Sequence, residues 1–269
     1  VHSEDETTVK ENLERYKLQF GDDIPVKFHP EIRSVEACYK STVKIIDLAK
    51  RTGARLHVFH LSTAKELDLF TNKIPLEEKK ITAEVCIHHL WFSDEDYATK
   101  GNLIKWNPAV KSSDDRKALW EALLDDRIDV IATDHAPHTL EEKSKKYLSA
   151  PSGGPLVQHA LLAMLEKVQE GIISIERVVE KMAHSPAICF RVKERGFIRE
   201  GYYADLVLID SNKSIFVNKE SLFYKCGWSP FEGVTFQSRV ISTFVNGDCV
   251  YHDGKLDIQR SGMRLHFNR

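Results

Sequence analysis

Short β-rich runs alternate with amphipathic helical patterns from the start of this chain to about residue 140. Ser34 is placed to cap a helix whose apolar positions recur at three- and four-residue steps, and Gly53 follows where a left-handed residue ends many helices. Runs rich in β-branched residues at 55–61, 81–87 and 128–133 predict successive buried strands. This alternation is typical of βα units built around a parallel sheet or barrel.

Further helical patterns follow along the chain. Ser113 precedes an apolar stripe that fits a crossover helix between parallel strands. After a loop at residues 139–154, Pro155 suits the first turn of a helix that runs to about Val168. Ser174 is placed to cap another helix.

The sequence becomes β-rich from about residue 196 onward. Asn246-Gly247 stands between two β-rich runs and is a strong hairpin signal. We therefore divide the chain into residues 1–195, which carry the α/β pattern, and residues 196–269, which form a small β module.

The charge balance excludes several classes of partner. The chain has 38 basic and 40 acidic residues that are interspersed, so we expect no charged surface that holds nucleic acid or an anionic membrane. No apolar stretch approaches the roughly 20 residues that a membrane span requires. The five cysteines are widely spaced, unlike those of a disulfide framework or a zinc ribbon, which favours a reduced, cytoplasmic protein.

Metal-type ligands stand at the expected carboxyl ends of three strands. His2, His60 and Asp134 each follow a β-rich run, and in α/β folds such ends gather around a shared mouth. Imidazole nitrogen and carboxylate oxygen suit zinc in a hydrolytic site, and a carboxylate beside the metal can also act as a base. A single strand-end His is more often a hydrogen-bonded structural residue, so His60 alone does not establish a metal site.

Other polar residues surround these strand ends. Asn107 offers an amide donor and acceptor, although Asn-Pro is also an ordinary turn. Asp134 is followed by His135 and His138, a concentration of polar groups that needs partners if it is buried. Gly154 leads into the expected helix, whose N-terminal N–H groups favour an anion, although a tight loop needs the same glycines.

His88 and His89 end the second predicted strand. Adjacent strand residues face opposite ways, so at most one of the two could point into the mouth. We interpret the pair as structural.

Several motifs together resemble the dihydroorotase family of cyclic amidohydrolases. They are Ala132-Thr133-Asp134-His135-Ala136-Pro137-His138, Trp106-Asn107-Pro108-Ala109-Val110-Lys111, His57-Val58-Phe59-His60-Leu61-Ser62-Thr63 and Ile87-His88-His89-Leu90. The tail, with runs at 201–208 and 244–247, is similar to the β module of the amidohydrolase superfamily. The Asp-His-Ala-Pro-His run distinguishes dihydroorotases from hydantoinases and allantoinases, and the resemblance covers essentially the whole chain.

The resemblance implies a TIM-like (β/α) barrel of the metal-dependent hydrolase type, with a zinc centre that usually holds two ions. The implied reaction is the reversible closure of N-carbamoyl-L-aspartate to L-dihydroorotate in pyrimidine synthesis. By resemblance, His2 and His60 would be ligands of the second metal, and Asp134 a ligand of the first and the proton shuttle. Asn107 and His138 would hold the substrate's ring amide and carboxylate, assisted by backbone near Gly154. The implied partner is this small molecule, and a homodimer is left open.

The sequence also departs from the family pattern. The family's His-x-His pair, the neighbouring Arg and the bridging carboxylated Lys or Asp would lie upstream of residue 1. The chain lacks an initiator Met and opens in what reads as the end of a strand. We therefore expect only the C-terminal strands and helices of a barrel, half of the metal site, and no turnover of dihydroorotate by this segment alone.

Two other classes of protein share parts of this pattern. One is another cyclic amidohydrolase, such as an allantoinase or a hydantoinase. The other is a non-catalytic relative that keeps the fold as an assembly scaffold. Such scaffolds typically lose metal ligands, so the retention of His2, His60 and Asp134 argues against the second class.

Overall fold

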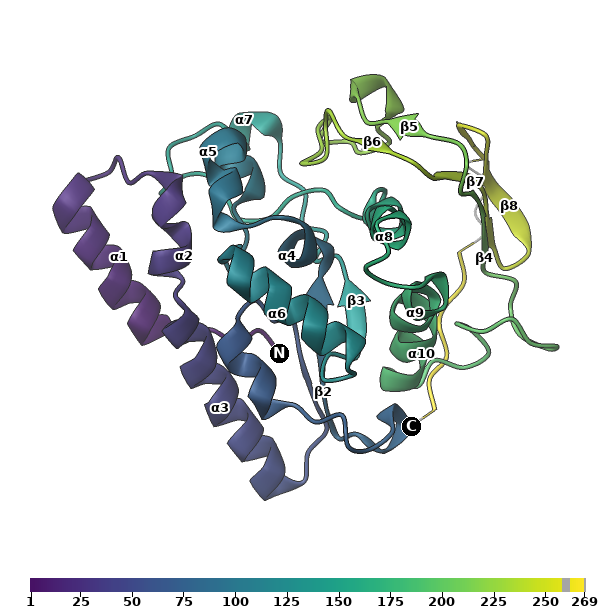
Figure 1. Cartoon of the computed structure of the whole chain (residues 1–269), viewed down its shortest axis with the longest axis horizontal. Helices are drawn as coiled ribbons and strands as arrows, with labels where there is room; N and C mark the ends of the chain where they lie inside the picture. Colours follow the sequence, from purple (N-terminus) through teal and green to yellow (C-terminus); the bar gives the residue numbers. More distant parts are fainter. Residues whose placement is uncertain (258–261, 269) are drawn as a thin grey trace. The chain divides into compact units, whose positions relative to one another are not determined.

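A computed structural model describes residues 1–257 and 262–268 of the chain (Figure 1). The chain divides into two units. The first consists of residues 1–160 together with 219–232, and the second of residues 161–218 together with 233–269. All the residues proposed above for a site fall within the first unit.

A three-stranded parallel sheet lies at the centre of the first unit (Figure 1). Its strands β1 (Leu56–Val58), β2 (Ile81–Cys86) and β3 (Val130–Ala132) follow one another in chain order. The three predicted strands are therefore confirmed, although each is shorter than its β-rich run. Val1 lies beside β1, because its carbonyl accepts from the Phe59 N–H at 3.0 Å.

Helices surround this sheet in the first unit. They are α1 (Glu6–Phe20), η1 (Val26–Phe28), α2 (His29–Ile32), α3 (Val35–Thr52), η2 (Ala64–Leu69), η3 (Leu76–Glu78), α4 (Ile87–Trp91), η4 (Asp94–Asp96), α5 (Tyr97–Lys100), η5 (Gly101–Ile104), α6 (Ser113–Leu124), α7 (Leu140–Lys143) and η7 (Lys219–Ser221). The predicted α3 is confirmed, with Ser34 accepting from the Ala37 N–H and Gly53 in the left-handed region. The cap of α6 is Ser112 rather than a residue after it, because the Ser112 hydroxyl accepts from the Asp115 N–H.

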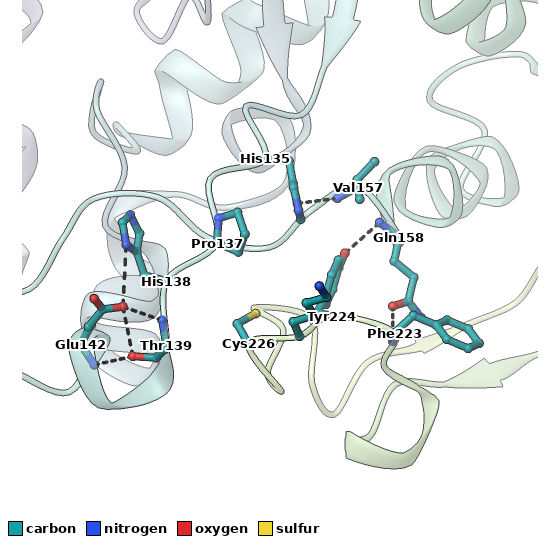
Figure 2. A pocket seen from close by; sticks show the side chains of 11 residues that line it. His135, Pro137, His138, Thr139, Glu142, Val157, Gln158, Phe223, Tyr224 and Cys226 are labelled. Atoms are coloured by element: carbon teal, nitrogen blue, oxygen red, sulfur yellow. Dashed lines mark hydrogen bonds and ion pairs between the residues drawn. The ribbon is translucent and has the colours of Figure 1, made fainter. Parts of the chain in front are cut away.

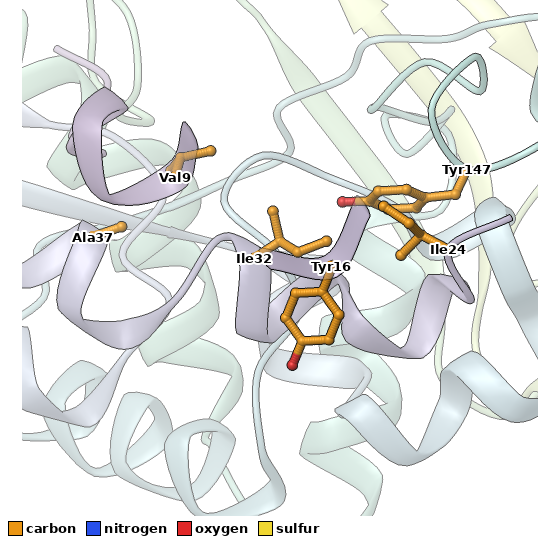
Figure 3. Packing of buried hydrophobic residues seen from close by; sticks show 6 residues of the cluster. All are labelled: Val9, Tyr16, Ile24, Ile32, Ala37 and Tyr147. Carbon is orange, nitrogen blue, oxygen red and sulfur yellow. The ribbon is translucent and has the colours of Figure 1, made fainter. Parts of the chain in front are cut away.

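An apolar cluster joins the N-terminal helices to the loop that follows β3 (Figure 3). Its buried members are Val9, Tyr16, Ile24, Ile32, Ala37 and Tyr147. Tyr147 comes from that loop, and its hydroxyl shares a hydrogen bond of 2.8 Å with Nδ1 of the buried His29. Burying a side chain of this size contributes about 1.5–3 kcal/mol. The loop after β3 is therefore held by the α1–α2 region.

The second unit combines a helical run with two antiparallel sheets. Its elements are α8 (Ala160–Gln169, whose first residue belongs to the first unit), α9 (Ile175–Val179), the π-helix η6 (Glu180–His184), α10 (Ser185–Cys189), β4 (Leu206–Asp210), β5 (Ile215–Phe216), β6 (Thr235–Phe236), β7 (Arg239–Val245), β8 (Asp248–His252) and β9 (Lys255–Leu256). The larger sheet has the order β4-β7-β8-β9, and β5 pairs with β6. The predicted Ser174 cap is confirmed, and so is the hairpin at Asn246-Gly247, where both residues have positive φ.

The expected helix start at Pro155 is wrong. Helix α8 begins only at Ala160. The preceding N–H groups are taken by side chains, because Leu156 and Val157 donate to His135 Nδ1 and Gln158 donates to the Tyr224 hydroxyl. These bonds hold the segment in a non-helical path.

Two composition-based expectations can be compared with the structure. All five cysteines are free, as predicted. Within the described ranges, no helix combines the length and the apolar character needed to cross a membrane.

Candidate metal and substrate site

The strand ends bring two of the predicted metal ligands into contact. His2 Nδ1 and His60 Nε2 lie 2.6 Å apart, and their rings stack at 4.9 Å between centroids. His60 follows β1 with φ 39°, and Asp134 follows β3 with φ 46°. A left-handed conformation costs a residue other than glycine roughly 1–3 kcal/mol and is concentrated at functional sites. Both strand ends therefore turn sharply at the residue predicted to act.

Burial and neighbouring charge set the protonation of these groups. Burial lowers the pKa of His60 to about 3, and the adjacent His2 acts in the same direction. Burial also raises the pKa of Asp134, while His2 partly opposes that shift. His60 is thus a neutral imidazole at ordinary pH, the form that binds metals. The charge of His2 therefore acts on both His60 and Asp134.

A second network connects the two predicted substrate-binding side chains. The Ser152 hydroxyl donates to Asn107 Oδ1 at 2.9 Å, and His138 Nε2 donates to the Ser152 carbonyl at 3.1 Å. Ser152 is therefore the residue that joins Asn107 to His138. Sequence reasoning assigned it no role, because a serine before two glycines carries no signal of its own.

The two glycines of this loop are required by close backbone approach. A Cβ at Gly153, which has φ +119°, would lie 2.6 Å from the Ala136 carbonyl oxygen. A Cβ at Gly154 would lie 2.9 Å from the Trp106 ring. Gly154 instead pairs with the 134–138 segment, because its carbonyl accepts from the Ala136 N–H. The expectation that Gly154 leads directly into a helix N-terminus is wrong, since α8 begins at Ala160.

Two buried lysines hold this loop, and sequence reasoning did not identify them. Lys143 Nζ donates to the carbonyls of Lys105, Pro151 and Gly153 at 2.8–3.2 Å. Lys105 Nζ donates to the carbonyls of Tyr147 and Ala150. Burial lowers the pKa of Lys143 to about 7 and that of Lys105 to about 8. Five backbone carbonyls are therefore held by the two lysine Nζ groups beside the Asn107–Ser152 contact.

A cavity of about 560 Å³ adjoins the 134–138 segment within the first unit (Figure 2). It is lined by His135, Pro137, His138, Thr139, Glu142, Val157, Gln158, Phe223, Tyr224, Lys225 and Cys226. His135 Nδ1 accepts from the Val157 N–H on the cavity wall, so this ring is engaged by backbone. Residues 223–226, which form one wall of the cavity, are far in sequence from the 134–138 segment. No local motif predicts that they lie there.

The interpretation of His88 and His89 as alternating strand residues is wrong in its premise. Both lie in helix α4, which begins immediately after β2. Their rings contact each other at 4.1 Å between centroids, and both side chains are buried. Burial lowers the pKa of His89 to about 3 and that of His88 well below its usual range.

The chain belongs to the amidohydrolase family, whose model matches residues 6–250. It is also similar to curated dihydroorotases. The protein of Pyrococcus abyssi is 34% identical over 223 residues, which are 82% of this chain and 52% of that protein. The protein of Carboxydothermus hydrogenoformans is 38% identical over 209 residues, which are 77% of this chain and 48% of that protein. The chain thus spans about half the length of the curated relatives it matches.

Solved structures of hydantoinases share the fold. The L-hydantoinase of Arthrobacter aurescens superposes with a TM-score of 0.88 at 27% identity, covering 96% of this chain and 58% of that one. A D-hydantoinase from Thermus sp. gives a TM-score of 0.88 at 22% identity, covering 97% of this chain and 58% of that one. The architecture is therefore that of an amidohydrolase.

Proposed function

We propose that this chain is the C-terminal part of a dihydroorotase that interconverts N-carbamoyl-L-aspartate and L-dihydroorotate in pyrimidine synthesis. The observation that carries the proposal is the contact of His2 with His60 after β1, in the same parallel sheet whose strand β3 leads into Asp134. Curated relatives named dihydroorotase, at 34% and 38% identity, support the same activity.

The fold proposal follows from the parallel sheet. Strands β1 to β3 would be consecutive strands of a TIM-like barrel. Residues 1–195 would form the C-terminal part of this barrel, and residues 196–269 would form the small β module. Val1 is hydrogen-bonded to the backbone of His57 and Phe59, which supports a further parallel strand beside β1. The closed barrel would need strands that this sequence does not supply.

The donor set at these strand ends fits zinc. His2 and His60 would supply two imidazole nitrogens, and Asp134 a carboxylate oxygen, which are ligand types that zinc takes in hydrolytic enzymes. Zinc bound there would polarise a carbonyl and make its bound water acidic. We propose two zinc ions per site, with the remaining ligands contributed upstream of residue 1.

The side chains of this chain would handle the proton and the substrate. Asp134 would accept a proton as the ring amide is attacked and deliver it to the departing nitrogen. Its raised pKa supports this role, because a general acid and base works best near the operating pH. Asn107 and His138 would hold the ring amide and the substrate carboxylate, and Ser152 would fix their spacing. The backbone near Gly154 would assist in holding the carboxylate.

The test is a substrate panel on the purified protein as expressed from its gene. Ring opening of L-dihydroorotate is expected to exceed that of hydantoin and allantoin, and the reaction should stop when a chelator removes zinc. Preference for hydantoin or allantoin would contradict the proposal. A polypeptide restricted to residues 1–269 is expected to be inactive on all three compounds.

A hydantoinase activity is the second candidate. It is favoured by the superposition with the L-hydantoinase of Arthrobacter aurescens. A non-catalytic scaffold role is opposed by the retained His2, His60 and Asp134. We also propose that the protein is cytoplasmic and acts on a small molecule, with a homodimer as an open alternative to a monomer.

A further inference from the structure

Three ligand-type side chains gather where β2 passes into α4. Cys86, His88 and His89 each offer one donor atom, and these atoms lie within 4.8 Å of one another. All three side chains are buried. Across residues 1–257 and 262–268, no other three cysteine, histidine or acidic donors gather this tightly.

The imidazoles of this cluster have unsatisfied hydrogen-bonding capacity. Both ring nitrogens of His88 and Nδ1 of His89 are buried without a hydrogen-bond partner. His89 Nε2 contacts the Pro108 carbonyl at 3.2 Å. Leaving a buried polar group unsatisfied costs about 1–3 kcal/mol. Three such atoms side by side therefore indicate that something else binds there.

The local chain geometry suits a metal ion. Cys86 is the extended residue that precedes α4, and His88 and His89 are in the first turn of that helix. Two residues separate Cys86 from His89, a spacing common among zinc ligands. The His88 ring is stacked on Trp106 at 4.3 Å, so its orientation is fixed before any ion arrives.

The thiol distinguishes a metal from a water molecule. Water could bond to the imidazole nitrogens, but it gives no reason for a buried thiol among them. Thiolate sulfur with imidazole nitrogen selects zinc among the common divalent ions. On binding, the Cys86 S–H bond would break, its proton would leave to solvent, and the sulfur lone pair would form the bond to zinc.

We propose that Cys86, His88 and His89 bind one zinc ion at a site distinct from His2, His60 and Asp134. Three protein ligands leave a fourth position for water. The ion joins the end of a central strand to the first turn of the next helix, so its role is to stabilise the sheet edge that carries the candidate active site. This site would exist whether or not the protein is a dihydroorotase.

Cobalt substitution tests the proposal on this chain directly. Cobalt(II) bound to a thiolate gives a charge-transfer band in the near ultraviolet, and the ligands proposed for the other site contain no sulfur. The wild-type chain titrated with cobalt(II) is expected to show this band. Cys86→Ala should abolish it and lower the zinc content by one equivalent. His60→Ala should keep the band, even though it removes a ligand of the other site.

Two controls keep the test decisive. Cys38→Ala removes another buried thiol and should leave the band unchanged. His88→Gln and His89→Gln keep polar groups in the cluster and should weaken cobalt binding at least tenfold, with circular dichroism reporting whether the fold persists. Absence of the band in the wild-type chain, or its survival in Cys86→Ala, would overturn the proposal. Neither result depends on dihydroorotate turnover, so this test is independent of the proposed function.

Discussion

His2 Nδ1 and His60 Nε2 face each other at 2.6 Å, although 58 positions separate the two residues in the sequence. The contact exists because Val1 pairs beside β1, which places the second residue of the chain opposite the residue that ends the strand. A direct bond between two imidazoles needs one ring nitrogen to donate and the other to accept, so a metal would replace this bond with two ligand bonds. Each ring is therefore expected to matter for zinc affinity.

His60→Ala is expected to weaken zinc binding by about 10- to 100-fold, because it removes a buried imidazole that is proposed as a ligand and leaves His2 without its partner. Competition with a chromophoric chelator measures the change. His252→Ala is the matched control, since His252 lies in β8 of the second unit and should leave zinc affinity unaltered.

Asp134→Asn is expected to lower kcat by at least about 100-fold in the protein expressed from its gene, because the amide cannot take up the proton. Steady-state kinetics with L-dihydroorotate measures the effect. Asp253→Asn, which breaks only an exposed ion pair with Arg239, should stay close to wild type. Equal activity of the two variants would refute the role of Asp134.

Gly153→Ala is expected to destabilise the first unit by about 1–3 kcal/mol, because the new Cβ meets a backbone oxygen at a φ that side chains rarely adopt. Urea denaturation gives the change in the free energy of unfolding. Gly262→Ala introduces a Cβ with nothing within 4 Å and should be nearly neutral. A neutral Gly153→Ala variant would show that the loop relaxes freely.

Lys143→Met is expected to cost about 1–3 kcal/mol, since three buried carbonyls lose the Nζ group that donates to them. Limited proteolysis should also cut the 144–152 segment faster. Lys146→Met provides the comparison, because its ion pair with Asp23 is exposed and is worth at most about 1 kcal/mol. Equal stability and equal resistance to proteolysis in the two variants would show that the hydrogen bonds of Lys143 do not stabilise the loop.

Acid is expected to destabilise the first unit through its buried histidines. Burial lowers the pKa of His29 well below its usual range, so the ring is neutral when folded and takes up a proton on unfolding. The stability that depends on this group is complete above about pH 6.5 and is lost as the pH falls below it. His29→Gln should reduce the slope of unfolding free energy against pH by about 1.4 kcal/mol per unit between about pH 6 and pH 5. Denaturation midpoints across this range check the difference, and an unchanged slope would show that His29 is protonated in the fold.

Local signals predicted the features that depend on local physics. The Ser34 cap and Gly53 bound helix α3, and Asn246-Gly247 formed its hairpin, because caps and tight turns are determined by neighbouring residues. The strands that precede His60 and Asp134 were recognised from their β-branched runs. The roles of His2, His60, Asp134, Asn107, His138 and Gly154 stay predictions.

Features that depend on distant contacts were not predictable from pattern. In the sequence, Lys143 stands among other charged residues and looks like a surface residue. It is buried in the fold because backbone carbonyls that are distant in sequence accept hydrogen bonds from its Nζ group. The start of α8 depends on two side chains that are distant in sequence. His135 accepts a hydrogen bond from the Leu156 N–H, and the Tyr224 hydroxyl accepts one from the Gln158 N–H. His88 and His89 were misplaced because a helix follows β2 without any intervening loop.

The packing of Tyr147 among the N-terminal helices has a consequence for how the protein opens. Tyr147 is anchored by His29 and by the Lys105 ammonium, which lies 4.4 Å from its ring. Amide protons of the loop should therefore exchange with solvent no faster than those of α1 and α2, because both must open together. Damage to a remote helix would then reach the loop after β3 as a loss of order, without any change in the residues proposed to hold the substrate.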